Sequence, residues 1–128
     1  MWRGVIASAT RGKRGQAFFR ALLAALDAMP EKQLVRGELE TAEGSVCALG
    51  CLGKARGVDL SVVDLENQDA EQIGIELGEL FGIAPQLAQE VMFVNDDRYR
   101  IDGPGARWRI VRDWAARQIR VEPRELKP

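Results

Sequence analysis

The chain has 128 residues, of which 46% are hydrophobic and 29% are charged, a composition typical of one folded domain. It contains no histidine, which excludes Ser-His and Cys-His catalytic pairs and zinc sites that use histidine. We therefore expect no enzyme activity, no cofactor and no metal site. No apolar run approaches the length of a transmembrane helix, so we expect no membrane partner.

Taken in chain order, residues 5–9 are too short to classify and fit either a strand or the lead-in to a helix. Apolar residues at helical spacing predict a helix over residues 13–29, which the following proline ends. Residues 33–41 then alternate weakly around Gly37, which indicates either a small hairpin or an irregular connection.

A second helix is expected over residues 46–56, with Ser45 as its N-cap and Gly57 just after its end. This stretch is rich in small residues and contains a Gly-Lys pair, but Ala55 follows the lysine where a phosphate-binding loop needs Ser or Thr. The small residues instead predict the close approach of another helix. The third helix offers a matching small surface at Gly74 and Gly78.

Three more helices are expected in the second half of the chain. Asp69 is a candidate N-cap for the third, which Gly82 ends. Pro85 suits the first position of the fourth, and Asn95 can close it in the left-handed conformation. The fifth covers residues 106–119.

These elements predict a mainly α fold, a compact bundle of about five helices with one small hairpin at 33–41 as an optional addition. Residues 1–120 are expected to form a single helical domain. Residues 121–128, with two prolines and four charges, are expected to form a flexible tail.

Charge is segregated along the chain. Residues 1–36 carry seven Lys and Arg and two acids, residues 37–97 carry two and thirteen, and residues 98–128 carry nine and four. The acidic and basic segments either neutralise each other within the fold or form binding faces. On the second interpretation, the candidate protein-binding acids are Asp69, Glu71, Glu76, Glu79, Asp96 and Asp97.

The last helix offers the basic candidates. An arginine face could contact phosphates of a nucleic acid, with Tyr99, Trp108 and Trp114 interleaved as stacking residues, although Trp108 lies on the apolar stripe. The candidate nucleic-acid-binding residues are Arg109, Arg112, Arg117 and Arg120.

Asn95, Asp96 and Asp97 form a compact polar group at a predicted helix end, with Glu90 about two turns earlier. Negative charge at a helix C-terminus is unfavourable, so we expect a compensating partner from among three arginines of the following segment. These are Arg98, Arg100 and Arg107.

Two cysteines, Cys47 and Cys51, are too few for a disulfide framework and indicate a reducing compartment, hence a cytoplasmic protein. Cys47 near a helix N-terminus could have a lowered thiol pKa and act as a nucleophile. With no base available, we interpret it as a small buried apolar side chain.

Three stretches carry a resemblance: the run from Cys47 to Gly57, the run from Phe81 to Asp96, and the Trp-containing helix over 107–119. They resemble a group of small uncharacterised proteins from phages, prophages and bacterial genomes, which has a Cys-Ala-x-Gly-Ala helix start and a later Asn-Asp motif. Cys51 departs from the alanine of that pattern. The resemblance implies a bacterial or viral cytoplasmic setting and assigns no activity.

These observations favour a non-enzymatic module that binds a host or phage protein, such as a phage accessory protein that engages or inhibits host machinery. One alternative is a nucleic-acid-binding protein that uses the arginine-rich last helix. A second alternative is a cysteine-dependent enzyme that uses Cys47. The oligomeric state is left open.

Overall fold

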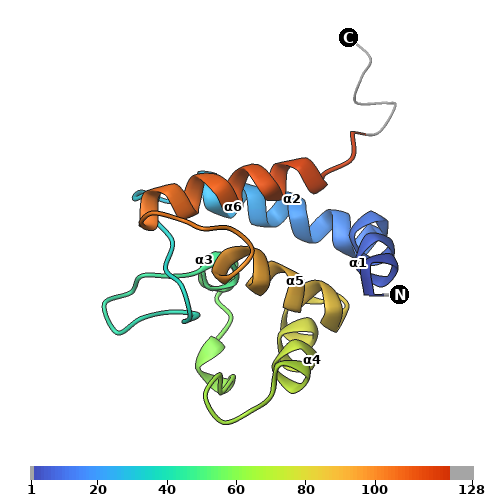
Figure 1. The fold of residues 1–128 in the computed structure, drawn as a ribbon, viewed down its shortest axis with the longest axis horizontal. Helices are drawn as coiled ribbons and strands as arrows, with labels where there is room; N and C mark the ends of the chain where they lie inside the picture. Colours follow the sequence, from blue (N-terminus) through green and yellow to red (C-terminus); the bar gives the residue numbers. More distant parts are fainter. Residues whose placement is uncertain (1, 122–128) are drawn as a thin grey trace.

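The computed structural model describes residues 2–121 of the chain (Figure 1). The helices in this part are α1 (Trp2–Arg11), α2 (Lys13–Asp27), α3 (Ala48–Arg56), the 3-10 helix η1 (Leu60–Val62), α4 (Ala70–Phe81), α5 (Pro85–Asp96) and α6 (Pro104–Gln118). The predicted mainly helical bundle is confirmed, with one α-helix more than expected. Of the described helices, none combines the length and the apolar character needed to cross a membrane.

Helix α5 is the centre of the bundle. It packs against α1, α3, α4 and α6, while α2 packs against α1, α3 and α6. In Figure 1, α2 and α6 lie side by side above α5, and α4 lies on the other side of α5. Four side chains of α5 are completely buried: Leu87, Ala88, Val91 and Val94. The apolar spacing that predicted this helix therefore marks its core-facing stripe.

The additional helix is α1, which contains residues 5–9, the stretch that fitted either a strand or a helix lead-in. Gly12 separates α1 from α2 and takes an extended conformation as the N-cap of α2. The first turn of α2 passes so close to α1 that a Cβ atom at Gly15 would lie 1.9 Å from the carbonyl oxygen of Ala9. Glycine is required there because the backbones touch.

Gln16 holds this break and the far end of the bundle together. Its Nε2 donates to the carbonyl oxygens of Thr10, at 2.8 Å, and Gln118, at 2.9 Å. Its Oε1 accepts a bond of 2.7 Å from the backbone N–H of Arg120. The half-buried side-chain amide of Gln16 thus provides hydrogen-bond partners for backbone groups at the ends of both α1 and α6.

The hairpin considered for residues 33–41 does not form, and the irregular connection is what the structure contains. The only β pairing in the described residues is an isolated antiparallel bridge between Glu40 and Val46. The backbone N–H of Val35 donates to Val46 O at 2.9 Å, and that of Leu34 donates to Pro104 O at 3.0 Å. The backbone of residues 45–47 also bonds to this segment, through Thr41 N–H to Ser45 O at 2.8 Å and Cys47 N–H to Leu39 O at 3.2 Å, but these bonds form no regular strand ladder.

Two helix ends differ from prediction. The N-cap of α3 is Cys47 rather than Ser45, and its Sγ accepts a bond of 3.4 Å from the backbone N–H of Gly50. Asn95 does not close α5 in the left-handed conformation, because it lies inside the helix, which continues to Asp96, and no described non-glycine residue has a positive φ. Burial of the Asn95 side chain explains this difference, as shown below.

Three capping residues agree with prediction. Asp69 caps α4 by accepting a bond of 2.8 Å from the backbone N–H of Gln72. Gly57 and Gly82 end α3 and α4 in the left-handed conformation, with φ values of 70° and 69°. Helix α6 begins at Pro104, two residues before the predicted start.

The small residues of α3 and α4 do not face each other, contrary to prediction. A Cβ at Gly50 would lie 1.8 Å from Leu39 O, in the irregular segment, and one at Gly53 would meet the Leu60 side chain. Gly74 and Gly78 instead lie against α5 and the residues just before it. A Cβ at Gly74 would lie 2.5 Å from the Gln89 side chain, and one at Gly78 would lie 2.7 Å from Ile83 O. The close approach is real, but its partners are the irregular segment and η1 for α3, and α5 with the residues before it for α4.

The predicted tail, residues 121–128, lies outside the described residues except for Val121, which is exposed.

Candidate functional site

An open groove of about 430 Å³ runs between α1, α4 and α5. Its walls are mostly apolar and come from Trp2 of α1, Ile73 of α4, and Met92 and Phe93 of α5. A volume of this size is within the range of sites that bind a ligand or a few side chains of a partner.

Two large rings at this groove are exposed to solvent. Trp2 is 46% exposed and Phe93 is 42% exposed, and Val5, one turn along α1 from Trp2, is 40% exposed. The other exposed large apolar residues of the described chain are Val62, in η1, and Val121. Clustered exposed aromatic side chains are typical of interaction surfaces, whereas isolated ones are ordinary.

A buried carboxylate lies among the groove residues. Glu90 is 3% exposed and accepts two bonds from Arg3, from Nη1 to Oε2 at 2.6 Å and from Nη2 to Oε1 at 3.3 Å. Arg98 Nη1 approaches Oε2 at 3.5 Å. The bond to Glu90 raises the pKa of Arg3, whose side chain is 63% exposed. A buried acid is therefore paired with a guanidinium that is mostly in solvent.

Asp96 and Asp97, both predicted for protein binding, also line the groove. Asp96 Oδ1 accepts a bond of 3.1 Å from the backbone N–H of Gly37, and Asp97 Oδ1 accepts one of 2.8 Å from Arg36 Nη2. Arg36 Nε also donates to Asp96 O at 2.9 Å. These two acids thus hold the 33–41 segment at the same time as they line the groove.

Of the three arginines expected to compensate the charge of the Asn95–Asp97 group, Arg107 contacts it, but the ion-pair partner of Asp97 is a different arginine. Arg107 is buried and donates to the backbone oxygen of Asn95. The partner of Asp97 is Arg36, which the sequence did not single out because it lies 61 residues away. Arg98 pairs with Glu90 instead.

The four acids predicted on and before α4 differ in their environments. Asp69 caps the helix, and Glu71 and Glu79 are exposed. Glu76 is half-buried, and its Oε2 is buried without a hydrogen-bond partner in the part of the chain that the structure describes. Among the ion pairs of residues 2–121, none involves these four acids. Ion pairs within residues 2–121 therefore neutralise acids on and just after α5, whereas the acids of α4 keep their negative charge.

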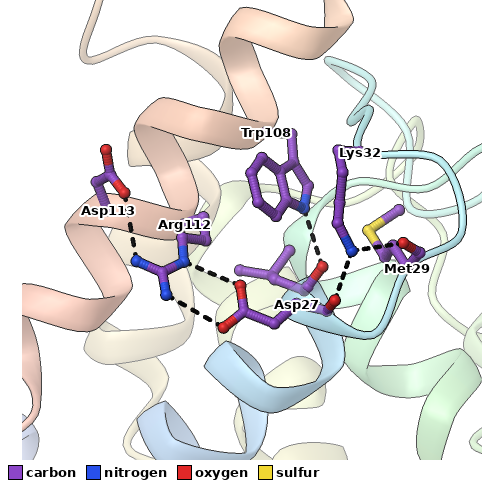
Figure 2. Close-up of polar contacts among 7 residues, drawn as sticks. Asp27, Met29, Lys32, Trp108, Arg112 and Asp113 are labelled. Carbon is purple, nitrogen blue, oxygen red and sulfur yellow. Dashed lines mark hydrogen bonds and ion pairs between the residues drawn. The ribbon is translucent and has the colours of Figure 1, made fainter.

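Of the candidate phosphate-binding arginines, Arg112 is already engaged. Its Nε and Nη2 donate to the two carboxylate oxygens of Asp27, at 2.9 and 3.1 Å, and Nη1 approaches Asp113 at 3.4 Å (Figure 2). The Arg112 side chain, which is 32% exposed, therefore joins α6 to the end of α2 at the surface. The bond to Arg112 holds the pKa of Asp27 below its ordinary value.

The same figure shows how the end of α2 is satisfied. Trp108 Nε1 donates to Leu26 O at 3.0 Å, and Lys32 Nζ donates to Met29 O at 2.6 Å and to Asp27 O (Figure 2). A cation and an N–H donor beside terminal carbonyls are the expected stabilisers of a helix C-terminus. These contacts therefore serve the fold.

The other three candidate arginines, Arg109, Arg117 and Arg120, are exposed. Trp114, considered as a stacking residue, is only 6% exposed and packs edge-to-face on Phe19, with ring centroids 5.4 Å apart. It is a core residue, so the basic face lacks this aromatic platform.

Both cysteines are buried. Burial raises the pKa of Cys47 to about 12 and that of Cys51 to about 11. For Cys47, burial outweighs the lowering effect of the bond from the Gly50 N–H at the start of α3. Both thiols are therefore protonated near neutral pH and lack the thiolate that nucleophilic chemistry requires.

No group of three or more Cys, Asp or Glu side chains within residues 2–121 is arranged to hold a metal ion. The groove described above is therefore the feature that combines accessible volume, exposed aromatic rings and charge.

The sequence does not predict Trp2, Arg3 or Phe93 as binding residues, and it indicates Glu90 only as an acid near the Asn95–Asp97 group. The sequence does contain one indication of the groove. Phe93 is a large apolar residue that lies outside the apolar stripe with which α5 faces the core. Trp2 could not be interpreted, since no helix was assigned to the stretch that carries it.

Comparison with protein-family models, with curated proteins and with solved structures finds no match to this chain.

Proposed function

We propose that the chain is a protein-binding module and that it docks its partner in the groove between α1, α4 and α5. The observation that carries the proposal is the exposure of Trp2 and Phe93 together on one apolar groove. Burying such rings supplies much of the binding free energy at protein interfaces. A host or phage protein is the class of partner that this module would take.

The occupant that fits the groove is a protein segment with apolar and basic side chains. Three carboxylates line the groove, on Glu90, Asp96 and Asp97, and the cation in the lining is Arg3. Arg36 and Arg98 pair with Asp97 and Glu90 from outside the lining. Two of the three walls, α4 and α5, belong to residues 57–97, a stretch without any Lys or Arg. Complementary charge favours the encounter with a basic partner and disfavours an acidic one.

The acids of α4 extend this preference beyond the groove. Asp69 and Glu71 flank Ala70, which lines the groove, and neither takes part in an ion pair within residues 2–121. Unpaired exposed acids beside an apolar groove provide a polar rim that can steer a cationic segment. Glu79, near the far end of the same helix, is outside this rim.

Affinity capture with matched variants tests the proposal. Wild-type protein, Phe93→Ala and Val62→Ala are immobilised and exposed to bacterial lysate, and each captured protein is then purified and titrated against all three. Both substitutions remove an exposed apolar side chain, but only Phe93 lies at the groove.

We expect a partner whose Kd rises about tenfold or more with Phe93→Ala, the change typical of an interface residue that contributes strongly. Val62→Ala should leave that Kd unchanged, and added salt should weaken binding. The proposal fails if Val62→Ala and Phe93→Ala have equal effects, or if no captured protein depends on Phe93.

A further inference from the structure

We infer that the groove recognises an arginine of the partner through Glu90, and that Arg3 occupies this position when the partner is absent. The inference rests on the proposed docking function and names the side chain that the groove selects.

The first reason is the geometry at Glu90. Both carboxylate oxygens face the guanidinium of Arg3, with Nη1–Oε2 at 2.6 Å and Nη2–Oε1 at 3.3 Å. Two nitrogens that face two oxygens form the fork-to-fork arrangement that arginine makes and lysine cannot. The protein itself therefore shows that this position accepts a guanidinium.

The second reason is the surroundings of the pair. Trp2 and Phe93 line the same groove, and aromatic rings stack favourably on the planar guanidinium. Arg98 approaches only Oε2 of Glu90, at 3.5 Å, so without Arg3 the buried Oε1 has no hydrogen-bond partner within residues 2–121, which is costly. When an arginine of the partner replaces Arg3, both oxygens of Glu90 keep a guanidinium beside them before and after binding.

The third reason is the weak attachment of Arg3. Its side chain is 63% exposed, against 4% for the Glu90 side chain. It lies in the first turn of α1, a helix with one buried residue, Ile6, which is itself 7% exposed. Arg3 can therefore move away without disturbing the core when another guanidinium takes its place at Glu90, which is fixed on the central helix.

NMR titration with a short peptide tests the inference directly. The probe is acetyl-Leu-Arg-Leu-amide, and its counterparts carry lysine, or the neutral isostere citrulline, in place of arginine. The proteins are wild type, Arg3→Ala, and Arg3→Ala combined with Glu90→Gln. Thermal unfolding first establishes that each variant is folded.

The apparent Kd equals the intrinsic Kd divided by the fraction of sites that Arg3 leaves open. If Arg3 occupies about nine sites in ten, Arg3→Ala should bind the arginine probe about tenfold more tightly than wild type. The lysine and citrulline probes should gain less than the arginine probe. Adding Glu90→Gln should abolish the gain. Arg11→Ala, which removes the same charge from the same helix outside the groove, is the matched control and should behave as wild type.

The inference is overturned if Arg3→Ala binds no more tightly, if the lysine probe gains equally, or if Glu90→Gln retains the gain. The first result shows that Arg3 does not compete, and the second shows that only net charge matters. If the probe experiment fails while partner binding still depends on Phe93, the docking function stands without an arginine-specific position. If both fail, the groove is not the docking site.

Discussion

The Oδ1 atom of Asn95 accepts a hydrogen bond of 3.1 Å from the backbone N–H of Ala48, across 47 residues of sequence. Asn95 is 1% exposed, and its Nδ2 donates to Val35 O at 2.9 Å. Ala48 begins α3, so this bond satisfies one of the free donors at the start of that helix. The Asn-Asp motif of one helix thus caps the Cys-Ala start of another.

Replacing Asn95 with alanine should therefore destabilise the fold. The change leaves the buried N–H of Ala48 and the carbonyl of Val35 without their partner, which costs about 1 to 3 kcal/mol per unsatisfied group. Urea unfolding measures the loss. Asn67→Ala is the matched control, because Asn67 is exposed and bonds only within its own turn. Equal losses in the two variants would contradict this role for Asn95.

The break between α1 and α2 predicts opposite effects at two glycines. Gly15→Ala should cost about 1 to 3 kcal/mol, because its Cβ would meet Ala9 O at 1.9 Å and the backbones would have to separate. Gly4→Ala should be neutral or stabilise the protein by up to about 1 kcal/mol, since nothing lies within 4 Å and alanine favours a helix. Thermal unfolding compares the two. A Gly15→Ala protein as stable as wild type would rule out the close approach.

The pair between Arg112 and Asp27 should make stability depend on acid. Arg112 lowers the pKa of Asp27 from 3.8, so the stabilisation is present above pH 3.8 and is lost as pH falls through the lowered value. Arg112→Ala should lower the free energy of unfolding near neutral pH by up to about 1 kcal/mol, since the pair is partly exposed. The difference from wild type should shrink at about pH 2. Arg109→Ala should show neither effect, because Arg109 has no such partner in residues 2–121.

Both thiols should be inert in the folded protein near neutral pH. Burial raises their pKa values from 9.0 to about 12 for Cys47 and about 11 for Cys51, so the folded state holds both protonated. Above pH 9.0 the unfolded chain releases these protons first, and the stability that burial of the neutral thiols contributes is lost as pH rises toward the folded values. A thiol reagent measures reactivity with and without denaturant. Rapid modification of one thiol in the folded protein would revive a nucleophilic role.

Much of the fold was predictable because local signals and tertiary contacts agree. Asp69, Gly57 and Gly82 end or begin helices as their residue types require, and the apolar stripe of α5 is the buried face. The end of α5 was misplaced because Asn95 has two possible uses. Its side chain favours a left-handed cap when exposed, but the buried bonds to Ala48 and Val35 keep it helical here.

The groove was less predictable because its residues come from separate parts of the chain. Asp96 and Asp97 were expected from their charge alone, whereas Arg3 and Glu90 meet only after α1 packs on α5, 87 residues apart in sequence. Short-range spacing cannot show such a pair. Exposure of Trp2 and Phe93 is likewise a property of the packed bundle, and only the position of Phe93 beside the stripe indicated it.

The docking of a partner in the groove is tested most directly by site-specific photo-crosslinking. The photoreactive amino acid p-benzoylphenylalanine replaces Phe93 in one protein and Val62, which is 63% exposed in η1, in another. We predict a protein partner crosslinked from position 93, in a yield that falls with added salt, and no crosslink to that partner from position 62. Equal crosslinking from both positions, or none from position 93, would contradict the proposed docking site.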